Sequence, residues 1–193
     1  MDFKCEQCSQ CCSDPALIVT LTHRDLLRFE FFLPDIDLFK IVAFYQIPDK
    51  DKTLEKRLMS PVILTNRGKI ILGLQKKDTK CVFLQGNECQ IYECRPQICR
   101  SFPYTFKITE DQIHWGYSQK ANEYCPAVKK DPPINTEQLE AQALEMHKES
   151  GEFKQLVYVW NNLAEKKLIN PAPELLLQFL TGKLKLTVEN LKK

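Results

Sequence analysis

Residues 5–12, CEQCSQCC, set the chemical character of this chain, because they bring Cys5, Cys8, Cys11 and Cys12 into eight positions. Two intervening residues let a tight turn place both sulfurs of a CxxC pair on one ion. Three thiolates at CxxCxxC spacing can therefore take three corners of a tetrahedral zinc site or of a cubane cluster. This clustering predicts a metal site rather than scattered buried thiols.

The adjacent pair Cys11 and Cys12 calls for a separate expectation. Neighbouring Cα atoms are about 3.8 Å apart, and in an extended chain their side chains point to opposite faces. We therefore expect the two thiols to serve different centres, or one of them to stay unligated.

The other five cysteines lie much farther along the chain. They are Cys81, Cys89, Cys94, Cys99 and Cys125. Cys81 and Cys89 flank a turn signal at residues 85–87 (QGN), so a hairpin would bring these two thiols together. Arg95 and Arg100 lie in the same segment, and guanidinium charge suits a site with several thiolates, which are costly to bury unpaired.

Together these features resemble the CxxCxxCC cysteine-cluster proteins, also known as the YkgJ-like zinc- or iron-chelating domain. The resemblance rests on the first block, on the segment from Cys81 through Arg95-Pro96 to residues 99–103 (CRSFP), and on Cys125-Pro126. It implies a metal-binding domain over residues 1–126, with residues 127–193 as a helical C-terminal extension packed on it. Carried over residue by residue, it leaves Cys94 as a spare thiol and implies eight metal ligands: Cys5, Cys8, Cys11, Cys12, Cys81, Cys89, Cys99 and Cys125.

The resemblance favours a metal-binding protein with a redox or metal-handling role. Thiolate ligands suit an iron–sulfur cluster or zinc and argue against magnesium or calcium. The triple CxxCxxC spacing slightly favours iron–sulfur over zinc. So does one branch of the family, which resembles flagellin lysine N-methylases that use S-adenosylmethionine and an iron–sulfur centre. Two alternatives stay open, a lysine N-methyltransferase of that branch and a purely structural zinc module for protein interaction; the chain's status as an enzyme, and any catalytic or cofactor-binding residue, are left undecided.

Composition excludes several other classes of protein. An odd number of cysteines and a beginning (MDFKCEQC) without an apolar region argue against a secreted disulfide scaffold, so we expect a cytoplasmic protein. A formal net charge of +2 gives no support to nucleic-acid binding. The apolar runs are far shorter than the roughly 20 residues of a membrane span. Metal ions are thus the expected partners, and a protein partner is left open.

The expected fold class is α+β, with a small metal-stapled antiparallel sheet, flanking helices and an α-helical C-terminal part. Expected strands are residues 16–21 and two hairpins, residues 61–76 and residues 104–117. Because structural zinc contributes about 10 to 16 kcal/mol, metal removal is expected to unfold at least residues 1–126.

The expected helices follow from caps and apolar spacing. One begins after Thr22, which has Asp25 three residues on, and stops at Pro34. The others are residues 35–46, a helix from 135 or 136 to 149 that Gly151 breaks, an amphipathic helix over 153–164, and a short helix over 174–180.

Overall fold

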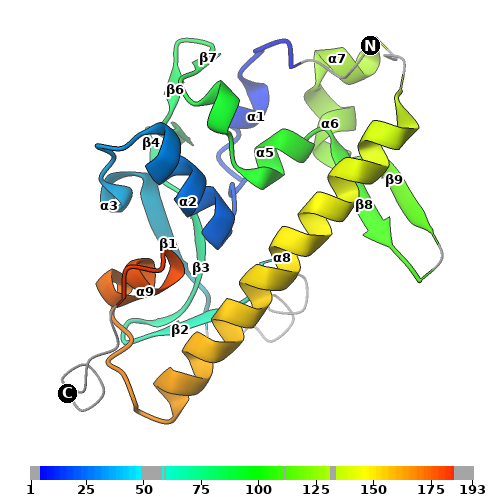
Figure 1. The fold of residues 1–193 in the computed structure, drawn as a ribbon. Helices are drawn as coiled ribbons and strands as arrows, with labels where there is room; N and C mark the ends of the chain where they lie inside the picture. Colours follow the sequence, from blue (N-terminus) through cyan, green and yellow to red (C-terminus); the bar gives the residue numbers. More distant parts are fainter. Residues whose placement is uncertain (1–4, 49–57, 59, 111, 131–133, 185–193) are drawn as a thin grey trace. The chain divides into compact units, whose positions relative to one another are not determined.

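A computed structural model describes residues 5–48, 58, 60–110, 112–130 and 134–184. The chain forms two compact units, each assembled from two separate stretches of sequence. Unit 1 comprises Met1–Val19 and Gln75–Lys148, and unit 2 comprises Thr20–Leu74 and Glu149–Lys193. Both units combine helices with antiparallel strands, which confirms the expected α+β class (Figure 1).

Unit 2 is built on a three-stranded antiparallel sheet. Its strands are β1 (Val42–Gln46), β2 (Ile63–Thr65) and β3 (Gly68–Leu74), in the order β1-β3-β2. The turn between β2 and β3 uses Gly68 at φ 105°, a conformation that favours glycine. The hairpin expected within residues 61–76 is therefore confirmed.

The helices before this sheet match expectation only in part. Helix α2 (His23–Phe32) begins at Thr22 with the predicted capping box, because Thr22 and Asp25 each accept the other's backbone N–H, and it ends before Pro34. The helix expected over residues 35–46 is wrong. Only one turn forms, α3 (Leu38–Ile41), after which the β-forming residues of β1 pair with β3. Tertiary pairing outweighs local helix propensity in this segment.

The strand expected over residues 16–21 is also wrong. Within that segment the structure shows a single isolated bridge, between Thr20 and Gly73, and residues 16–20 are at least partly exposed. Leu21 alone is buried, and its N–H donates to the carbonyl of Leu72. The apolar run is therefore an irregular segment leading into α2.

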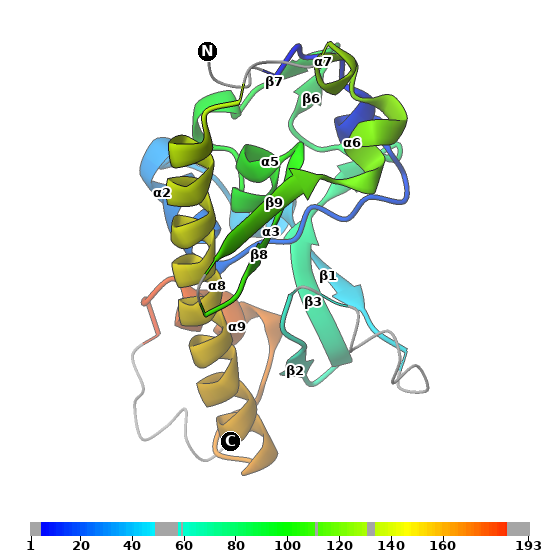
Figure 2. The ribbon, with the colours of Figure 1, turned by 90° about the vertical axis from the view of Figure 1, so that its right-hand side faces the viewer.

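Helix α8 (Thr136–Glu165) is the longest element and runs without a break in Figure 2. The Asn135 side chain accepts the N–H of Gln138 at 3.1 Å, which confirms a cap at the predicted start. The break expected at Gly151 is wrong, because one glycine costs a helix interior only about 1 kcal/mol. No helix in the described part of the chain is long and apolar enough to cross a membrane.

Unit 2 has an apolar core of its own. From the second half of α8, Phe153, Val157 and Trp160 are buried, as is Leu176 of α9 (Pro173–Leu180). Each large side chain buried in this way contributes about 1.5 to 3 kcal/mol. The same half of α8 also satisfies strand β2, since Asn161 accepts the N–H of Leu64 and donates to the carbonyl of Val62.

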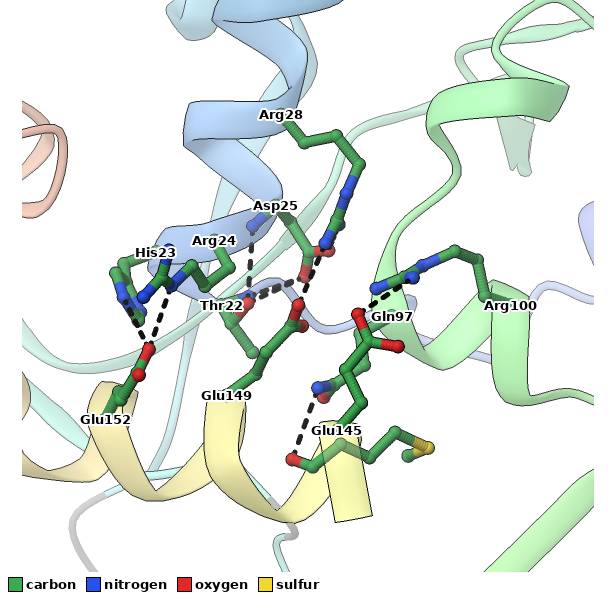
Figure 3. A network of polar contacts seen from close by, with 11 residues as sticks. Thr22, His23, Arg24, Asp25, Arg28, Gln97, Arg100, Glu145, Glu149 and Glu152 are labelled. Carbon is green, nitrogen blue, oxygen red and sulfur yellow. Dashed lines mark hydrogen bonds and ion pairs between the residues drawn. The ribbon is translucent and has the colours of Figure 1, made fainter. Parts of the chain in front are cut away.

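A buried ionic network accompanies this core in unit 2. Arg28 of α2 lies 2.6 Å from Asp25 and 3.0 Å from Glu149 of α8, as Figure 3 shows. Asp25 is completely buried. The guanidinium therefore balances two carboxylates that are removed from water.

Unit 1 consists mostly of short elements around the cysteines. Two-residue ladders are too short to be stable alone, so they depend on what they pack against or bind. The hairpin of β8 (Tyr104–Ile108) and β9 (Ile113–Tyr117) confirms the one expected within residues 104–117; Asp111 of its turn lies outside the described residues. The other elements are α1 (Gln10–Ser13), β4 (Lys76–Lys77), β5 (Lys80–Cys81), β6 (Leu84–Gln85), β7 (Glu88–Cys89), η1 (Tyr92–Cys94), α5 (Gln97–Ser101), α6 (Gln119–Tyr124) and α7 (Pro126–Lys129).

Candidate metal centre

Every cysteine of the chain lies in unit 1. All nine are among the described residues, and none of them forms a disulfide. Unit 2 has no cysteine, although residues 20–74 lie between the two cysteine groups in sequence. The fold therefore places residues 20–74, which separate the two sets of cysteines in sequence, in a different unit from the thiols.

The first cysteine block folds as tight turns followed by one helical turn. Gln7 and Ser9 have φ values of 53° and 60°, in the left-handed region, and reverse the chain between successive cysteines. Cys11 and Cys12 lie in α1, so the extended conformation assumed for this pair is not the one found. Their sulfurs are 3.9 Å apart. Four Zn–S bonds of about 2.3 Å give a tetrahedral edge of about 3.8 Å, so both thiols can fit on one ion.

The segment that carries Cys81 and Cys89 lies against this block. Ser9 Oγ donates to Asn87 Oδ1 at 3.2 Å, which joins the first block to the turn between β6 and β7. Helix α1 also contacts β5, which ends at Cys81. Cys89 pairs with Leu84 across the β6–β7 ladder, so Cys81 and Cys89 end two successive small hairpins rather than facing each other across one.

Beyond the effect of burial, the charges of neighbouring thiols act on the pKa values of several cysteines. A charge on Cys12 raises the pKa of Cys5, Cys81 and Cys89; Cys8 does the same to Cys5, and Cys89 to Cys81. The hydrogen bond with Cys11, together with burial, raises the pKa of Cys12. These electrostatic effects and the Cys11–Cys12 contact link six of the eight predicted ligands: Cys5, Cys8, Cys11, Cys12, Cys81 and Cys89.

Three of these thiols have a backbone donor that the sequence reasoning missed. Burial raises the pKa of Cys5, of Cys89 and of Cys81, the last to about 11. In each case the N–H of the residue two positions later acts in the opposite direction, from Gln7, Ile91 and Phe83 respectively. The bond from Gln7 N–H to Cys5 Sγ is 3.4 Å long. Donors aimed at sulfur stabilise the thiolate, which is the form that binds metal.

Positive side chains also face the thiols. Arg95 lowers the pKa of Cys5, Cys12 and Cys89, as expected for a guanidinium near several thiolates. Its position is fixed, because Nε donates to the Tyr92 carbonyl at 2.8 Å and the guanidinium lies 3.7 Å over the Tyr92 ring. Lys76, which the sequence reasoning did not single out, lowers the pKa of Cys81.

The other three cysteines lie in or beside helical elements of unit 1. Cys99 lies inside α5, and Cys125 lies at the junction of α6 and α7, buried with Ala121 and Ala127. Cys94 is buried at the end of η1. The assignment of Cys99 and Cys125 as ligands, and of Cys94 as a spare thiol, stays a prediction.

The donor set fits a soft metal in composition. Six neighbouring sulfurs, backbone N–H donors and a fixed guanidinium form surroundings in which thiolates can be held. Among the described residues, no group of three or more His, Cys, Asp or Glu side chains is closed into a metal-coordinating arrangement. The sulfurs are thus neighbours that would have to close around an ion.

Comparison with known proteins finds a family match that covers all nine cysteines. The sequence model of the CxxCxxCC family, described as "Putative zinc- or iron-chelating domain", matches residues 4–126. The uncharacterized protein MJ0661 of Methanocaldococcus jannaschii is 28% identical over 125 residues, which are 64% of this chain. The matched region spans 56% of that relative's length. No solved structure has significant similarity to the chain. Because the family match covers more than half of the sequence, this chain belongs to the CxxCxxCC family of zinc- or iron-chelating domains.

Proposed function

We propose that unit 1 holds a thiolate-ligated metal centre around Cys12 and that the protein handles zinc or iron through it. The set of backbone N–H donors to Cys5, Cys81 and Cys89 carries this proposal. Burial alone works against ionisation of these thiols, whereas a bound cation would offset that cost and make the N–H donors favourable. The ligands would come from Cys5, Cys8, Cys11, Cys12, Cys81, Cys89, Cys99 and Cys125.

The Cys11–Cys12 pair supports zinc as the first candidate metal. At 3.9 Å, the two sulfurs have the separation of two ligands on one tetrahedral ion. A cubane with four cysteines places one cysteine on each iron, so it would use this pair less well. More thiols gather here than one tetrahedral ion needs, and the surplus supports exchange of ligands, as metal handling requires.

An iron–sulfur cluster is the second candidate. The CxxCxxC spacing of Cys5, Cys8 and Cys11 supports it, as does the position of Cys12 among thiols of both groups. A [2Fe–2S] cluster, with two cysteines on each iron, would also accept the Cys11–Cys12 pair. Lysine methylation gains no supporting observation from the described residues of either unit.

Elemental analysis and the absorption spectrum of anaerobically purified protein test the proposal. We expect bound metal in the wild type, loss of most of it in Cys12→Ser, and retention in the control Cys94→Ala. Zinc in a colourless protein would support the first candidate; iron with acid-labile sulfide and a brown colour would support the second. A wild type without metal, or a Cys12→Ser protein with full metal content, would overturn it.

A further inference from the structure

Unit 1 contains a cavity in which no cysteine is among the lining residues. Its volume is about 420 Å³, and residues between Arg95 and Tyr104 line it together with Asn135 and the first turns of α8. This volume lies within the range of roughly 300 to 1,000 Å³ typical of small-molecule sites. The cavity therefore has room for a small organic molecule.

The charges around the cavity favour an anion. Two arginines, Arg95 and Arg100, line it, against one carboxylate, Glu145. Arg100 Nη1 lies 3.5 Å from Glu145 Oε1 (Figure 3), and the Glu145 side chain is 55% exposed. So long and exposed an ion pair contributes little, so Glu145 offsets only a small part of the positive charge at Arg100. The fork of an arginine matches the two oxygens of a carboxylate or phosphate.

Hydrogen bonds hold this wall of the cavity in place. Gln142 Nε2 donates to the Arg100 carbonyl at 2.9 Å. Gln97 Nε2 donates to the Met146 carbonyl at 3.2 Å. Both bonds tie α5 to the part of α8 that belongs to unit 1. The backbone that carries Arg100 is thus fixed before any ligand arrives.

Aromatic side chains supply the apolar part of the lining. Phe102 and Tyr104 face the cavity, and Tyr104 is stacked on Tyr117 with ring centroids 5.3 Å apart. Burial, and secondarily Tyr117, raise the pKa of Tyr104 to about 12, so its hydroxyl stays protonated at neutral pH. The wall can therefore contact an apolar group of a ligand.

We propose that this cavity binds a small organic oxyanion, a carboxylate or a phosphate ester, with Arg100 and Arg95 on the oxyanion and Phe102 and Tyr104 on its apolar part. Arg95 is shared, since it lines the cavity and its charge also acts on the thiols of Cys5, Cys12 and Cys89. The site itself does not depend on which metal the centre holds.

Isothermal titration of the metal-loaded full chain with four probes tests this inference. The probes are acetate, phenylacetate, inorganic phosphate and phenyl phosphate. We expect each phenyl compound to bind more tightly than its parent anion, because only it reaches the aromatic wall. The better of the two phenyl compounds then distinguishes a carboxylate site from a phosphate site.

Arginine variants locate the binding. Arg100→Gln should weaken the better phenyl probe by about tenfold to a hundredfold, the effect of losing a charged hydrogen-bonding partner. Arg100→Lys keeps the charge but loses the forked guanidinium, so its affinity for the probe should lie between those of the wild type and Arg100→Gln. If Arg100→Gln does not fold, Arg100→Lys replaces it in the test. Arg67→Gln is the matched control, since Arg67 is 65% exposed and belongs to unit 2.

Three results would overturn the inference. They are the absence of binding by all four probes at millimolar concentration, unchanged binding in both Arg100 variants, and equal weakening in Arg67→Gln. Metal content is measured on the same samples. Failure of oxyanion binding in protein that keeps its metal would contradict the cavity site alone and leave the proposed metal centre standing.

Discussion

Arg28 lies between two carboxylates in unit 2, Asp25 and Glu149, of which the first is fully buried and the second 8% exposed. Truncating one partner of such a network leaves charge buried without compensation. We therefore expect Arg28→Ala to lower the free energy of unfolding by about 3 to 5 kcal/mol. Urea unfolding followed by the fluorescence of the buried Trp160 would measure this loss.

Arg24→Ala is the matched control for that prediction. Arg24 also pairs with a carboxylate of α8, Glu152, at 2.8 Å, but its side chain is 48% exposed. An exposed pair contributes about 1 kcal/mol or less, so this variant should unfold close to the wild type. Similar losses in Arg28→Ala and Arg24→Ala would mean that burial is not what gives the Arg28 network its weight.

Cys94 and Cys99 are expected to differ although they are five residues apart. Cys94 is 4% exposed, and the family resemblance gives it no role, so Cys94→Ser should keep its metal. Cys99→Ser should lose metal because that position matches the family motif. Elemental analysis of the folded fraction of each variant would decide. If both variants lost the same amount of metal, the assignment of ligands in the second cysteine group would be wrong.

At the scale of elements, the glycine inside α8 offers a stabilising substitution. Apart from its own stretch of helix, an added Cβ at Gly151 would meet no atom of the described residues within 4 Å. Alanine loses less conformational entropy in a helix, so Gly151→Ala should raise the free energy of unfolding by about 0.5 to 1 kcal/mol. For a chain of this length that corresponds to a rise in Tm of up to roughly 2 to 4 °C, measurable by circular dichroism.

Gly68→Ala provides the opposite control. Its Cβ would also find open space, but its backbone has φ 105°, which an L side chain rarely adopts. We expect this variant to be less stable than the wild type.

The prediction for Gly151→Ala would be contradicted by a Tm below that of the wild type. That result would mean that helix α8 needs flexibility at residue 151.

Local signals predicted some elements well and failed where distant partners decide. The capping box at Thr22 and Asp25, the hairpin ending in Gly68 and the β8–β9 hairpin depend on neighbours in sequence, and all are found. The helix expected over residues 35–46 is not found. Its second half forms strand β1 instead, because it pairs with β3, about 30 positions away in sequence. Cysteine spacing likewise predicted the candidate thiols. It did not predict the backbone N–H donors to sulfur or the contact of the Cys81–Cys89 segment with the first cysteine block, because both depend on the folded conformation.

At the scale of the whole molecule, the cysteines and the larger apolar core lie in different units. All cysteines lie in unit 1, whereas Trp160, Phe29 and Leu72 form the core of unit 2. Structural zinc contributes about 10 to 16 kcal/mol, as much as the entire stability of a typical domain. We expect chelation of the metal to unfold unit 1 and leave unit 2 folded. The sequence alone predicted unfolding of at least residues 1–126, whereas residues 20–74 within that range belong to unit 2.

Hydrogen exchange with and without a chelator would measure this difference. Amides of α5 and α6 in unit 1 should lose protection, while those of β3 in unit 2 should keep it. Returning zinc or iron should restore the first group. Loss of protection in β3 together with α5, or in neither, would contradict the separation.

The discontinuous order of the two units has a consequence for synthesis of the chain. Unit 1 takes its first thiols from the beginning of the sequence and its last, Cys125, from far downstream. At about 5 to 20 residues per second, roughly 6 to 24 s pass between the appearance of Cys5 and that of Cys125 on a ribosome. Throughout that interval the earliest thiols are exposed to oxidants and to competing ions. Newly made protein should therefore depend on the redox and metal conditions at the ribosome more than the finished protein does.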